Sequence, residues 1–269
     1  MSVAIDARRP QIGGLLREWR ERRRLSQLDL ALQAEISTRH LSFVETGRSR
    51  PSSEMILRLT DQLDVPLRER NRLLLAAGYA PFYAETALDS PHMDAVRVAV
   101  RQVLVGHEPF PAVAVDRAWN IVDANESSTK VFLEGVAPDL LQPPVNALRV
   151  ALHPDGLAAR IINLGEWRAH LLGRVRRELA SSADARLAEL YSELRGYPCD
   201  QVEPEPDWHG PGGVVVPLRI RFADRELEFL SMVASFGTPR DITVDELAIE
   251  SFFPADQDTA ATLRRVASE

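Results

Sequence analysis

The sequence predicts two domains of different fold class: an all-α N-terminal domain, and an α+β C-terminal domain with a five-stranded antiparallel sheet and a helical insert. Three observations lead to this prediction. Apolar residues recur at helical spacing from Ile12 to Ala77, short β-branched runs follow residue 110, and a helical stretch separates two of these runs from three later ones. The 269 residues are 45% apolar, enough for two cores. We place the domains at residues 1–80 and 93–269, with a linker at 81–92.

The first and the last two helices of the N-terminal domain follow from apolar spacing and helix-breaking residues. Residues 53–63 predict a fourth helix after Pro51, and residues 68–77 predict a fifth that Pro66 opens and Gly78 ends. The first helix is amphipathic, with its apolar residues at positions i, i+3, i+4 and i+7: Ile12, Leu15, Leu16 and Trp19.

Between these helices, residues 25–51 predict two short helices joined by a tight turn. Ser26 can accept a hydrogen bond from a backbone N–H three residues later, so the first of the two begins there. Ser37 repeats this capping pattern and Gly47 can adopt the left-handed conformation that ends a helix, so the second runs from Ser37 to Thr46. Such a pair is typical of a helix-turn-helix motif, which places its second helix in the major groove of DNA.

The charge distribution favours DNA binding over the alternative, an ordinary helical hairpin in an all-α protein. Residues 1–80 carry 14 Arg and Lys against 10 Asp and Glu, whereas the rest of the chain carries 18 against 29. A basic domain beside an acidic one suits a domain that contacts phosphate. Leu41 and Val44 face inward in the second helix, which leaves an outer face as the candidate reader of base edges: Thr38, Arg39, Ser42 and Phe43.

The order Leu-Ser-Gln…Leu-Ala…Ile-Ser…Leu-Ser…Val-Glu-Thr-Gly-Arg…Pro-Ser resembles the five-helix DNA-binding domain of the phage-repressor, or XRE, family. The resemblance implies that Arg39 reads a guanine, that Phe43 meets a thymine methyl, and that Arg48 and Arg50 hold the phosphate backbone. The full set of predicted DNA-binding residues is Gln27, Ser37, Thr38, Arg39, Ser42, Phe43, Arg48 and Arg50.

Three further positions of the N-terminal domain are informative in the light of this resemblance. Arg20 and Glu45 match a family pair that ties the first helix to the end of the second motif helix, and we expect them to be scaffold. Glu35 stands at the turn where relatives usually have glycine, which puts the left-handed geometry of that turn in question.

The C-terminal domain begins with a β-hairpin over residues 111–124, two β-branched runs around an Asp-Arg turn. Residues 125–195 return to helical spacing. Three strands then follow, with Ala223-Asp-Arg as the turn between the first two, and we expect the helices to pack on one face of the sheet. These strands are predicted at Val214–Phe222, Glu226–Phe236 and Glu246–Phe252.

This order of strands and helices resembles a PAS-like sensor domain, with Asp116–Asn125 as its opening hairpin. The stretches His153-Pro-Asp-Gly156, Phe236-Gly-Thr-Pro239 and Glu250-Ser-Phe-Phe-Pro-Ala-Asp256 are similar to the ligand-binding domain of MmyB-like regulators, in which an XRE domain precedes a PAS-like one. The resemblance implies a transcription regulator that senses a small hydrophobic, fatty-acid-like ligand.

A PAS-like sheet and its helices enclose an apolar cavity, although each candidate lining residue also suits a plain core. The predicted apolar lining is Trp119, Phe132, Trp167, Leu171, Phe229 and Met232, with Leu152, Ile161 and Ile162 as further candidates. If the ligand is a carboxylate, its charged end needs a donor, and three such residues lie close together in sequence: Arg149, His153 and Arg160.

The remaining signals limit the function classes. The six His residues are scattered without metal-ligand spacing or a nucleophile turn, so we expect no enzyme, no metal and no cofactor. The single cysteine, Cys199, excludes an intramolecular disulfide and fits a reducing cytoplasm. No signal peptide and no apolar run of ~20 residues is present, so we expect a cytoplasmic protein without a membrane span.

We expect a homodimer that binds double-stranded DNA at two half-sites about 10 bp apart. A DNA-bound scaffold that acts through protein–protein contacts, without a small-molecule ligand, is the alternative. A scaffold would have no buried cavity. The direction in which ligand shifts DNA binding does not follow from the sequence.

Overall fold

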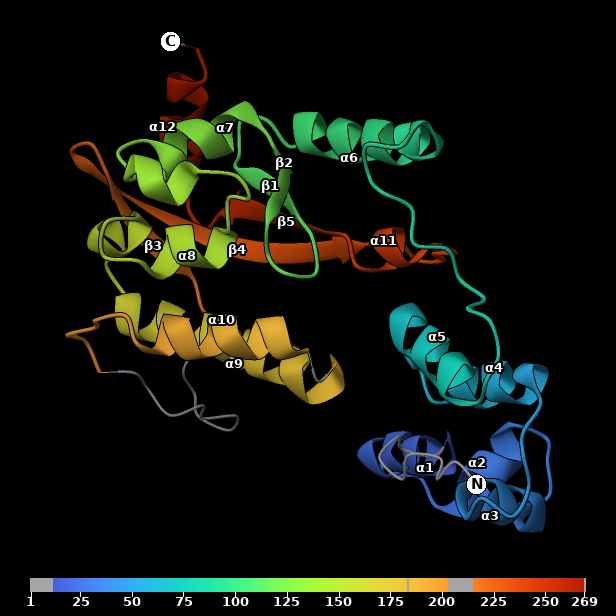
Figure 1. Ribbon diagram of the computed structural model, residues 1–269. Coiled ribbons are helices and arrows are strands. Elements are labelled where there is room, and N and C mark those ends of the chain that lie inside the picture. Colours follow the sequence, from blue (N-terminus) through green and yellow to red (C-terminus); the bar gives the residue numbers. More distant parts are fainter. Residues whose placement is uncertain (1–11, 183, 203–214, 269) are drawn as a thin grey trace, which may run out of the picture. The chain divides into compact units, whose positions relative to one another are not determined.

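The computed structural model describes residues 12–182, 184–202 and 215–268, which fall into two compact units (Figure 1). One unit comprises Met1–Thr86 together with Thr238–Asp245, and the other comprises Ala87–Gly237 and Glu246–Glu269. The segment 238–245, which connects two strands of the C-terminal sheet, therefore folds with the N-terminal unit.

The N-terminal unit is all-α in its described residues, as predicted. Ser26 and Ser37 cap the second and third helices, and the Ser26 cap is reciprocal: its hydroxyl accepts from the Asp29 backbone N–H at 3.1 Å, while the Asp29 carboxylate accepts from the Ser26 N–H at 3.0 Å. The helices are α1 (Ile12–Arg22), α2 (Gln27–Gln33), α3 (Thr38–Glu45), α4 (Ser53–Gln62), α5 (Leu67–Ala76) and the short α11 (Ile242–Asp245).

Two backbone features fix the position of α3. Glu35 adopts φ 53°, so the turn before α3 is left-handed although a glutamate occupies it. Gly13 of α1 lies directly against the end of α3, because a Cβ at this position would stand 2.2 Å from the carbonyl oxygen of Val44. Helix α1 can therefore approach α3 this closely only with glycine here.

The described residues of the C-terminal unit form a five-stranded antiparallel sheet in the order β2-β1-β5-β4-β3, which confirms the predicted sheet. The third strand begins at Leu218, later than predicted, and the predicted start at Val214 lies outside the described residues. The strands are β1 (Ala112–Val115), β2 (Ile121–Ala124), β3 (Leu218–Phe222), β4 (Arg225–Ser235) and β5 (Ala248–Pro254).

The helical insert between β2 and β3 is confirmed as a broken series of helices. Asn125 caps its first turn by accepting from the Ser128 N–H. Among the described residues, three α-helices lie outside the insert and outside the elements that the sequence predicts: α6 (Asp94–Gly106), α11 and α12 (Gln257–Val266). The insert contains α7 (Glu126–Ser128), a π-helical turn (Thr129–Leu133), 3₁₀ turns (Pro138–Leu141 and Leu157–Arg160), α8 (Ala147–Leu152), α9 (Leu164–Ser182) and α10 (Ala185–Arg195).

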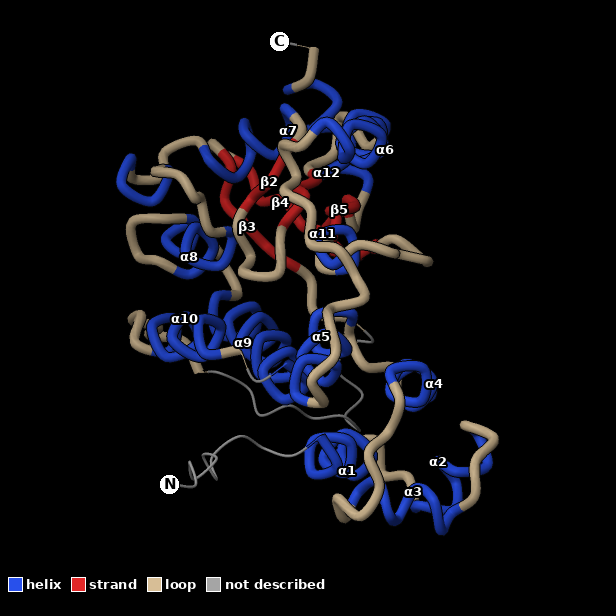
Figure 2. Tube along the Cα trace, turned by 45° about the vertical axis from the view of Figure 1, so that its right-hand side comes forward, coloured by secondary structure: helices blue, strands red, loops and turns tan. Residues whose placement is uncertain are grey.

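Both faces of the sheet carry helices, which corrects the expectation of one covered face. Side chains alternate along each strand, so Val113 faces the insert while its neighbours Ala112 and Ala114 face the other side, where Val100 and Leu104 of α6 cover them. Figure 2 shows α8 and α6 on opposite sides of the strands. The main core lies between the insert and the first face.

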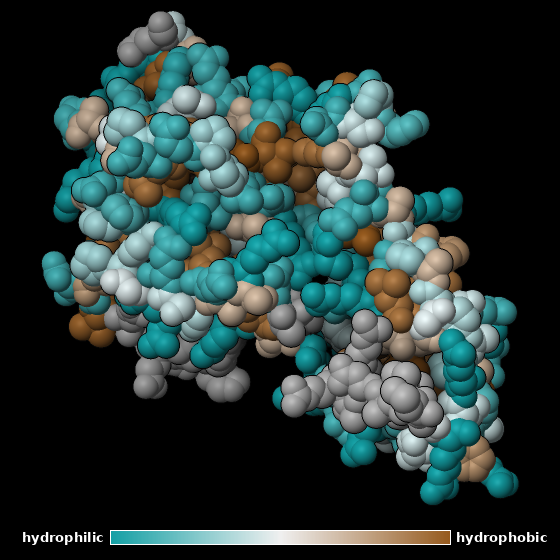
Figure 3. Space-filling view, in the orientation of Figure 1, coloured by the Kyte–Doolittle hydropathy of each residue, from teal (hydrophilic) through white to brown (hydrophobic). Residues whose placement is uncertain are grey.

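The second face is only partly covered among the described residues. Leu230 and Phe253 are partly exposed there, Met232 is 63% exposed, and α6 itself exposes Val98 and Val103. Figure 3 shows apolar side chains reaching the surface close to α6.

Candidate functional site

The outer face of α3 presents an aromatic ring close to two cations. The guanidinium groups of Arg39 and Arg48 lie 5.4 and 5.9 Å from the centroid of the Phe43 ring, a cation–π arrangement. Both arginines are exposed, and neither forms an ion pair with a described residue. Their charges are therefore available to an anionic partner such as a nucleic-acid backbone.

A buried ion pair holds α3 against α1. Arg20 donates from Nε to Glu45 Oε1 at 2.7 Å and from Nη2 to Oε2 at 3.0 Å, and its Nη1 donates to the Leu25 carbonyl. The hydrogen bond to Glu45 raises the pKa of Arg20. The structure thus confirms the predicted contact between the first helix and the end of α3.

Two predicted DNA-contacting residues each donate a hydrogen bond within the protein. The Gln27 amide donates to Glu45 Oε2 at 2.8 Å, which adds it to the pair above. The Arg50 guanidinium donates to the Ala77 carbonyl at 2.5 Å and lies over the Tyr79 ring. Arg50 thus ties the loop after α3 to the end of α5. Its side chain is nevertheless exposed, and its contact with the phosphate backbone stays a prediction.

The other predicted residues of α3 lie at its start and on its outer side. The Ser37 hydroxyl accepts from the His40 N–H at 3.2 Å and so caps the helix. Thr38 and Ser42 are half-buried on the helix that carries Arg39 and Phe43. Their contact with DNA stays a prediction.

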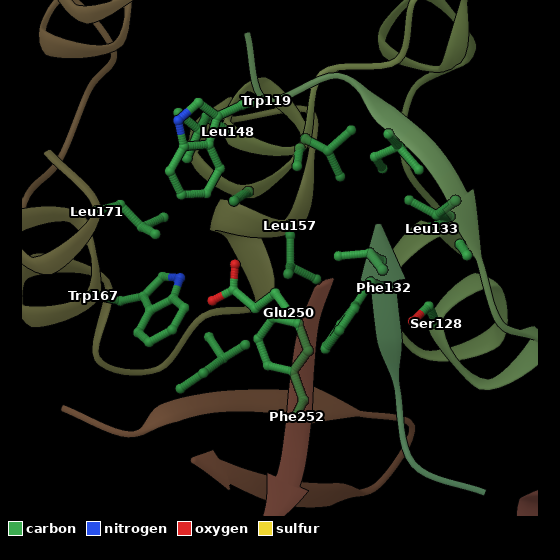
Figure 4. A pocket seen from close by; sticks show the side chains of 17 residues that line it. Trp119, Ser128, Phe132, Leu133, Leu148, Leu157, Trp167, Leu171, Glu250 and Phe252 are labelled. Atoms are coloured by element: carbon green, nitrogen blue, oxygen red, sulfur yellow. The ribbon is translucent and has the colours of Figure 1, made fainter. Parts of the chain in front are cut away.

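The C-terminal unit contains an apolar cavity of about 70 Å³ between the sheet and the insert (Figure 4). Four of the predicted apolar residues line it: Trp119, Phe132, Trp167 and Leu171. Leu148 and Leu157 of the insert and Phe252 of β5 complete much of its wall. The structure thus brings these four together, while their contact with a ligand stays a prediction.

The other two predicted apolar residues lie elsewhere. Phe229 is fully buried and packs its edge against Phe132, with ring centroids 5.8 Å apart, but it does not line the cavity. Met232 lies three residues further along β4, so it points to the opposite face of the sheet and is exposed. The alternation of the strand therefore excludes Met232 from this cavity. The further candidates Leu152, Ile161 and Ile162 also lie outside its lining.

The three predicted head-group donors do not reach the cavity either. Arg149 forms two 2.8 Å hydrogen bonds to the carboxylate of Glu193. His153 accepts from the Asp155 backbone N–H at 3.1 Å, and Arg160 donates to the Phe132 carbonyl at 3.0 Å, while burial lowers the pKa of Arg160. None of the three lines the cavity. Closeness in sequence did not bring them to one ligand site.

The polar residues at the cavity wall are not among those that the sequence predicts. Glu250 of β5 is 5% exposed, lines the cavity, and accepts at Oε1 from Arg174 Nη1 at 2.8 Å. Arg174 of α9 lies over the Trp119 ring at 4.6 Å, and the Trp119 indole N–H donates to Glu178 at 2.9 Å. Burial raises the pKa of Glu178. Strand alternation is the sequence signal that could have identified Glu250, because residues two apart in a strand, such as Glu250 and Phe252, face the same side of the sheet.

A neutral imidazole stands beside this cluster. His170 stacks on Trp167, with ring centroids 5.2 Å apart. Burial, together with the charges of Arg174 and Arg177, lowers the pKa of His170 to about 4. At neutral pH the ring is therefore uncharged and contributes no positive charge to the cavity wall.

The described residues contain no group of three or more His, Cys, Asp or Glu side chains placed to hold a metal ion. Over the same ranges, no helix combines the length and the apolar character that crossing a membrane requires.

Comparison with known proteins gives matches to both units. Residues 96–266 match the family described as MmyB-like transcription regulator ligand binding domain, and residues 11–73 match a helix-turn-helix domain family. Three relatives, one from Mycobacterium bovis and two from strains of Mycobacterium tuberculosis, are described as uncharacterized HTH-type transcriptional regulators. Each is 31% identical over 129 residues, which is 48% of this chain and 43% of the relative. The chain thus spans less than half the length of these curated relatives.

Proposed function

The chain belongs to the MmyB-like transcription regulators with an N-terminal helix-turn-helix domain, and on that premise we propose that it binds double-stranded DNA and responds to a small hydrophobic ligand. Helix α3 would enter the major groove, and the apolar cavity would take the ligand. The observation that carries the proposal is the exposed pair of cations, Arg39 and Arg48, next to the ring of Phe43.

The geometry supports a division of roles on α3. Arg39 stands on the helix and can reach the acceptor atoms of guanine, which are the commonest partners of arginine in the major groove. Arg48 follows the helix in a loop, a position suited to phosphate. The contacts of Arg20, Gln27 and Glu45 fix the helix that presents both.

The volume of the cavity limits the size of the ligand that it can hold. Pockets for drug-sized ligands hold roughly 300–1,000 Å³. The present cavity holds about 70 Å³, so a long fatty-acid chain would have to displace the insert to enter. The family resemblance suggests a fatty-acid-like ligand, and the small volume of the cavity favours a short molecule. A buried apolar cavity also favours a sensor over a DNA-bound scaffold without ligand.

The chain provides a route from ligand to DNA-binding unit. The segment 238–245 folds with the N-terminal unit, where Asp241 accepts from Thr86 Oγ1 at 2.7 Å and Asp245 accepts from the Leu67 N–H at 3.2 Å. It runs directly into β5, which carries Glu250 of the cavity wall. A ligand that shifts β5 would bias this segment, and a differential affinity of a few kcal/mol is enough to change DNA occupancy.

We also propose that the protein acts as a homodimer. Exposed apolar side chains on α6, with Val98 at 55% and Val103 at 48%, offer a surface that a second copy would bury. Two DNA-binding units would then bind half-sites about 10 bp apart.

The proposal is tested by selecting sites from a random duplex library with the full chain, and by native mass spectrometry of the purified protein. We expect the selected sites to contain paired half-sites and the spectra to show a dimer with a bound small molecule. A selection without enrichment would refute the DNA-reading assignment. An empty cavity, together with DNA binding that no small molecule alters, would favour the scaffold.

A further inference from the structure

One oxygen of the buried Glu250 carboxylate has no partner among the described residues. Its Oε1 accepts from Arg174, whereas Oε2 forms no hydrogen bond with any of them. The side chain is 7% exposed, and Figure 4 shows its carboxylate pointing into the cavity beside Trp167. Oε2 is therefore open to the cavity, where it can accept a hydrogen bond from a donor on a ligand.

From this geometry we infer that the cavity takes a small apolar molecule with a hydrogen-bond-donating end, such as a hydroxyl or an amide, in preference to a carboxylate. The inference rests on the proposed function and specifies the ligand of the same site. The donor group of the ligand would form a hydrogen bond to Glu250 Oε2, and its apolar part would lie against Trp119, Phe132 and Leu171.

The charges around the cavity argue against an anionic ligand. Glu250 and Arg174 neutralise one another, and Glu178 adds a second acidic group beside the Trp119 indole. The neutral His170 supplies no compensating cation, and the positive charge of Arg177, which lowers the pKa of His170, also acts on the acidic Glu178. A ligand carboxylate would lose its hydration and face Glu250, because the guanidinium that could balance it is already engaged. A neutral donor meets no such penalty, and a hydrogen bond to a carboxylate is stronger than one between neutral groups.

The size of the cavity restricts the ligand further. The cavity volume of about 70 Å³ is well below the roughly 300–1,000 Å³ of pockets that hold drug-sized ligands. A ligand of a few heavy atoms fits this space with little displacement of the insert.

Butyramide and butyrate form a matched pair of probes, since they share a chain and differ in whether the end donates or is anionic. We would titrate each into the full chain and follow the indole N–H resonances of Trp119 and Trp167 by NMR. We expect butyramide to bind at least about tenfold more tightly than butyrate, the difference that one charge-assisted hydrogen bond supplies. Equal or tighter binding of butyrate, or no shift with either probe, would overturn the inference.

Substitution of the acceptor gives an independent check. Glu250→Gln keeps one oxygen for Arg174 and turns an amide N–H₂ toward the cavity, so the preference for butyramide should fall to near unity or reverse. Glu193→Gln is the matched control, because Glu193 also pairs with an arginine but lies outside the cavity. A preference unchanged in Glu250→Gln would count against the inference. If Glu250→Gln does not fold, the ranking of the two probes on the native chain still decides.

DNA affinity measured in the same samples separates this inference from the proposed function. Butyramide binding without any change in DNA affinity would leave the inference standing and refute ligand control. Butyrate binding more tightly and altering DNA affinity would support ligand control and refute the inference.

Discussion

Arg20 shows how much of this structure depends on single buried side chains. Its guanidinium makes three hydrogen bonds, two to Glu45 and one to the Leu25 carbonyl, and the Glu45 side chain is 1% exposed. A carboxylate so buried is stable only while its partner is present. The same carboxylate accepts from Gln27, so one pair fixes α1, α2 and α3 together.

Arg20→Ala should destabilise the N-terminal unit by about 3–5 kcal/mol, since it leaves Glu45 buried and unpaired. Urea unfolding followed by the indole N–H resonance of Trp19 in NMR spectra measures the change, since the chain has four tryptophans whose fluorescence overlaps. Arg17→Ala is the control, because Arg17 pairs with Glu21 at the exposed surface, where ion pairs add little to stability. Similar losses in the two variants would show that the buried pair has no special role.

At the scale of elements, the position of α3 depends on a contact with α1 that only glycine permits. A Cβ on Gly13 would stand 2.2 Å from the Val44 carbonyl oxygen and 2.7 Å from that of Glu45. A Cβ on Gly14, the next residue, would meet no described atom within 4 Å, so the two adjacent glycines differ in what they contribute.

Gly13→Ala should cost roughly 1–3 kcal/mol of stability, because α1 and α3 must separate to admit the methyl group. Gly14→Ala should instead stabilise by up to about 1 kcal/mol, since alanine is the better helix former and finds open space. Thermal unfolding of both variants tests this pair, and opposite signs are expected. A stable Gly13→Ala variant would mean that α1 does not constrain α3.

The proposed role of α3 in the major groove leads to a second prediction at the scale of elements. Arg39→Ala should weaken specific DNA binding by about 1–3 kcal/mol and relax the base preference at one position of the site. Arg48→Ala should instead weaken binding to all DNA sequences alike, and it should reduce the slope of log affinity against log salt concentration by about 1. Fluorescence anisotropy on a selected site and its single-base variants, over a range of salt, separates these outcomes. Unchanged specificity in Arg39→Ala would remove Arg39 from the groove.

At the scale of the whole molecule, the chain passes between the two units more than once. It passes between the two units at residues 86–87, 237–238 and 245–246, because the β4–β5 connection folds with the N-terminal unit. Asp241 fixes that connection by accepting from the backbone and hydroxyl of Thr86 and from the Thr243 N–H. The chain therefore connects the two units through more than the linker after residue 86.

Asp241→Asn should loosen this connection, because it replaces charge-assisted hydrogen bonds with weaker ones. The amides of Thr86 and Thr243 should exchange about tenfold faster in hydrogen-exchange NMR, whereas amides of β3 should be unaffected. Asp224→Asn, at the exposed β3–β4 turn, is the control. Exchange at Thr86 that matches the native chain would show that Asp241 does not hold the segment.

Local signals in the sequence predict most of the fold. The caps at Ser26 and Ser37, the hairpin and the three later strands depend on residues within a few positions of one another, so periodicity and capping chemistry are sufficient. Helices α6, α11 and α12 are not predicted, and neither is the cover that α6 gives to the second face.

Sequence alone was enough to establish the two fold classes, the helix that carries Arg39 and Phe43, and four aromatic or aliphatic residues of the cavity wall. The three-dimensional arrangement was needed to show that Met232 points away, that Arg50 binds the Ala77 carbonyl, and that Glu250 meets Arg174 inside the cavity. The features that the sequence established and those that required the structure differ in the sequence separation of the interacting residues. A cap or a strand depends on neighbours in sequence, whereas a buried ion pair between β5 and α9 depends on strand register and helix packing across 76 residues of separation.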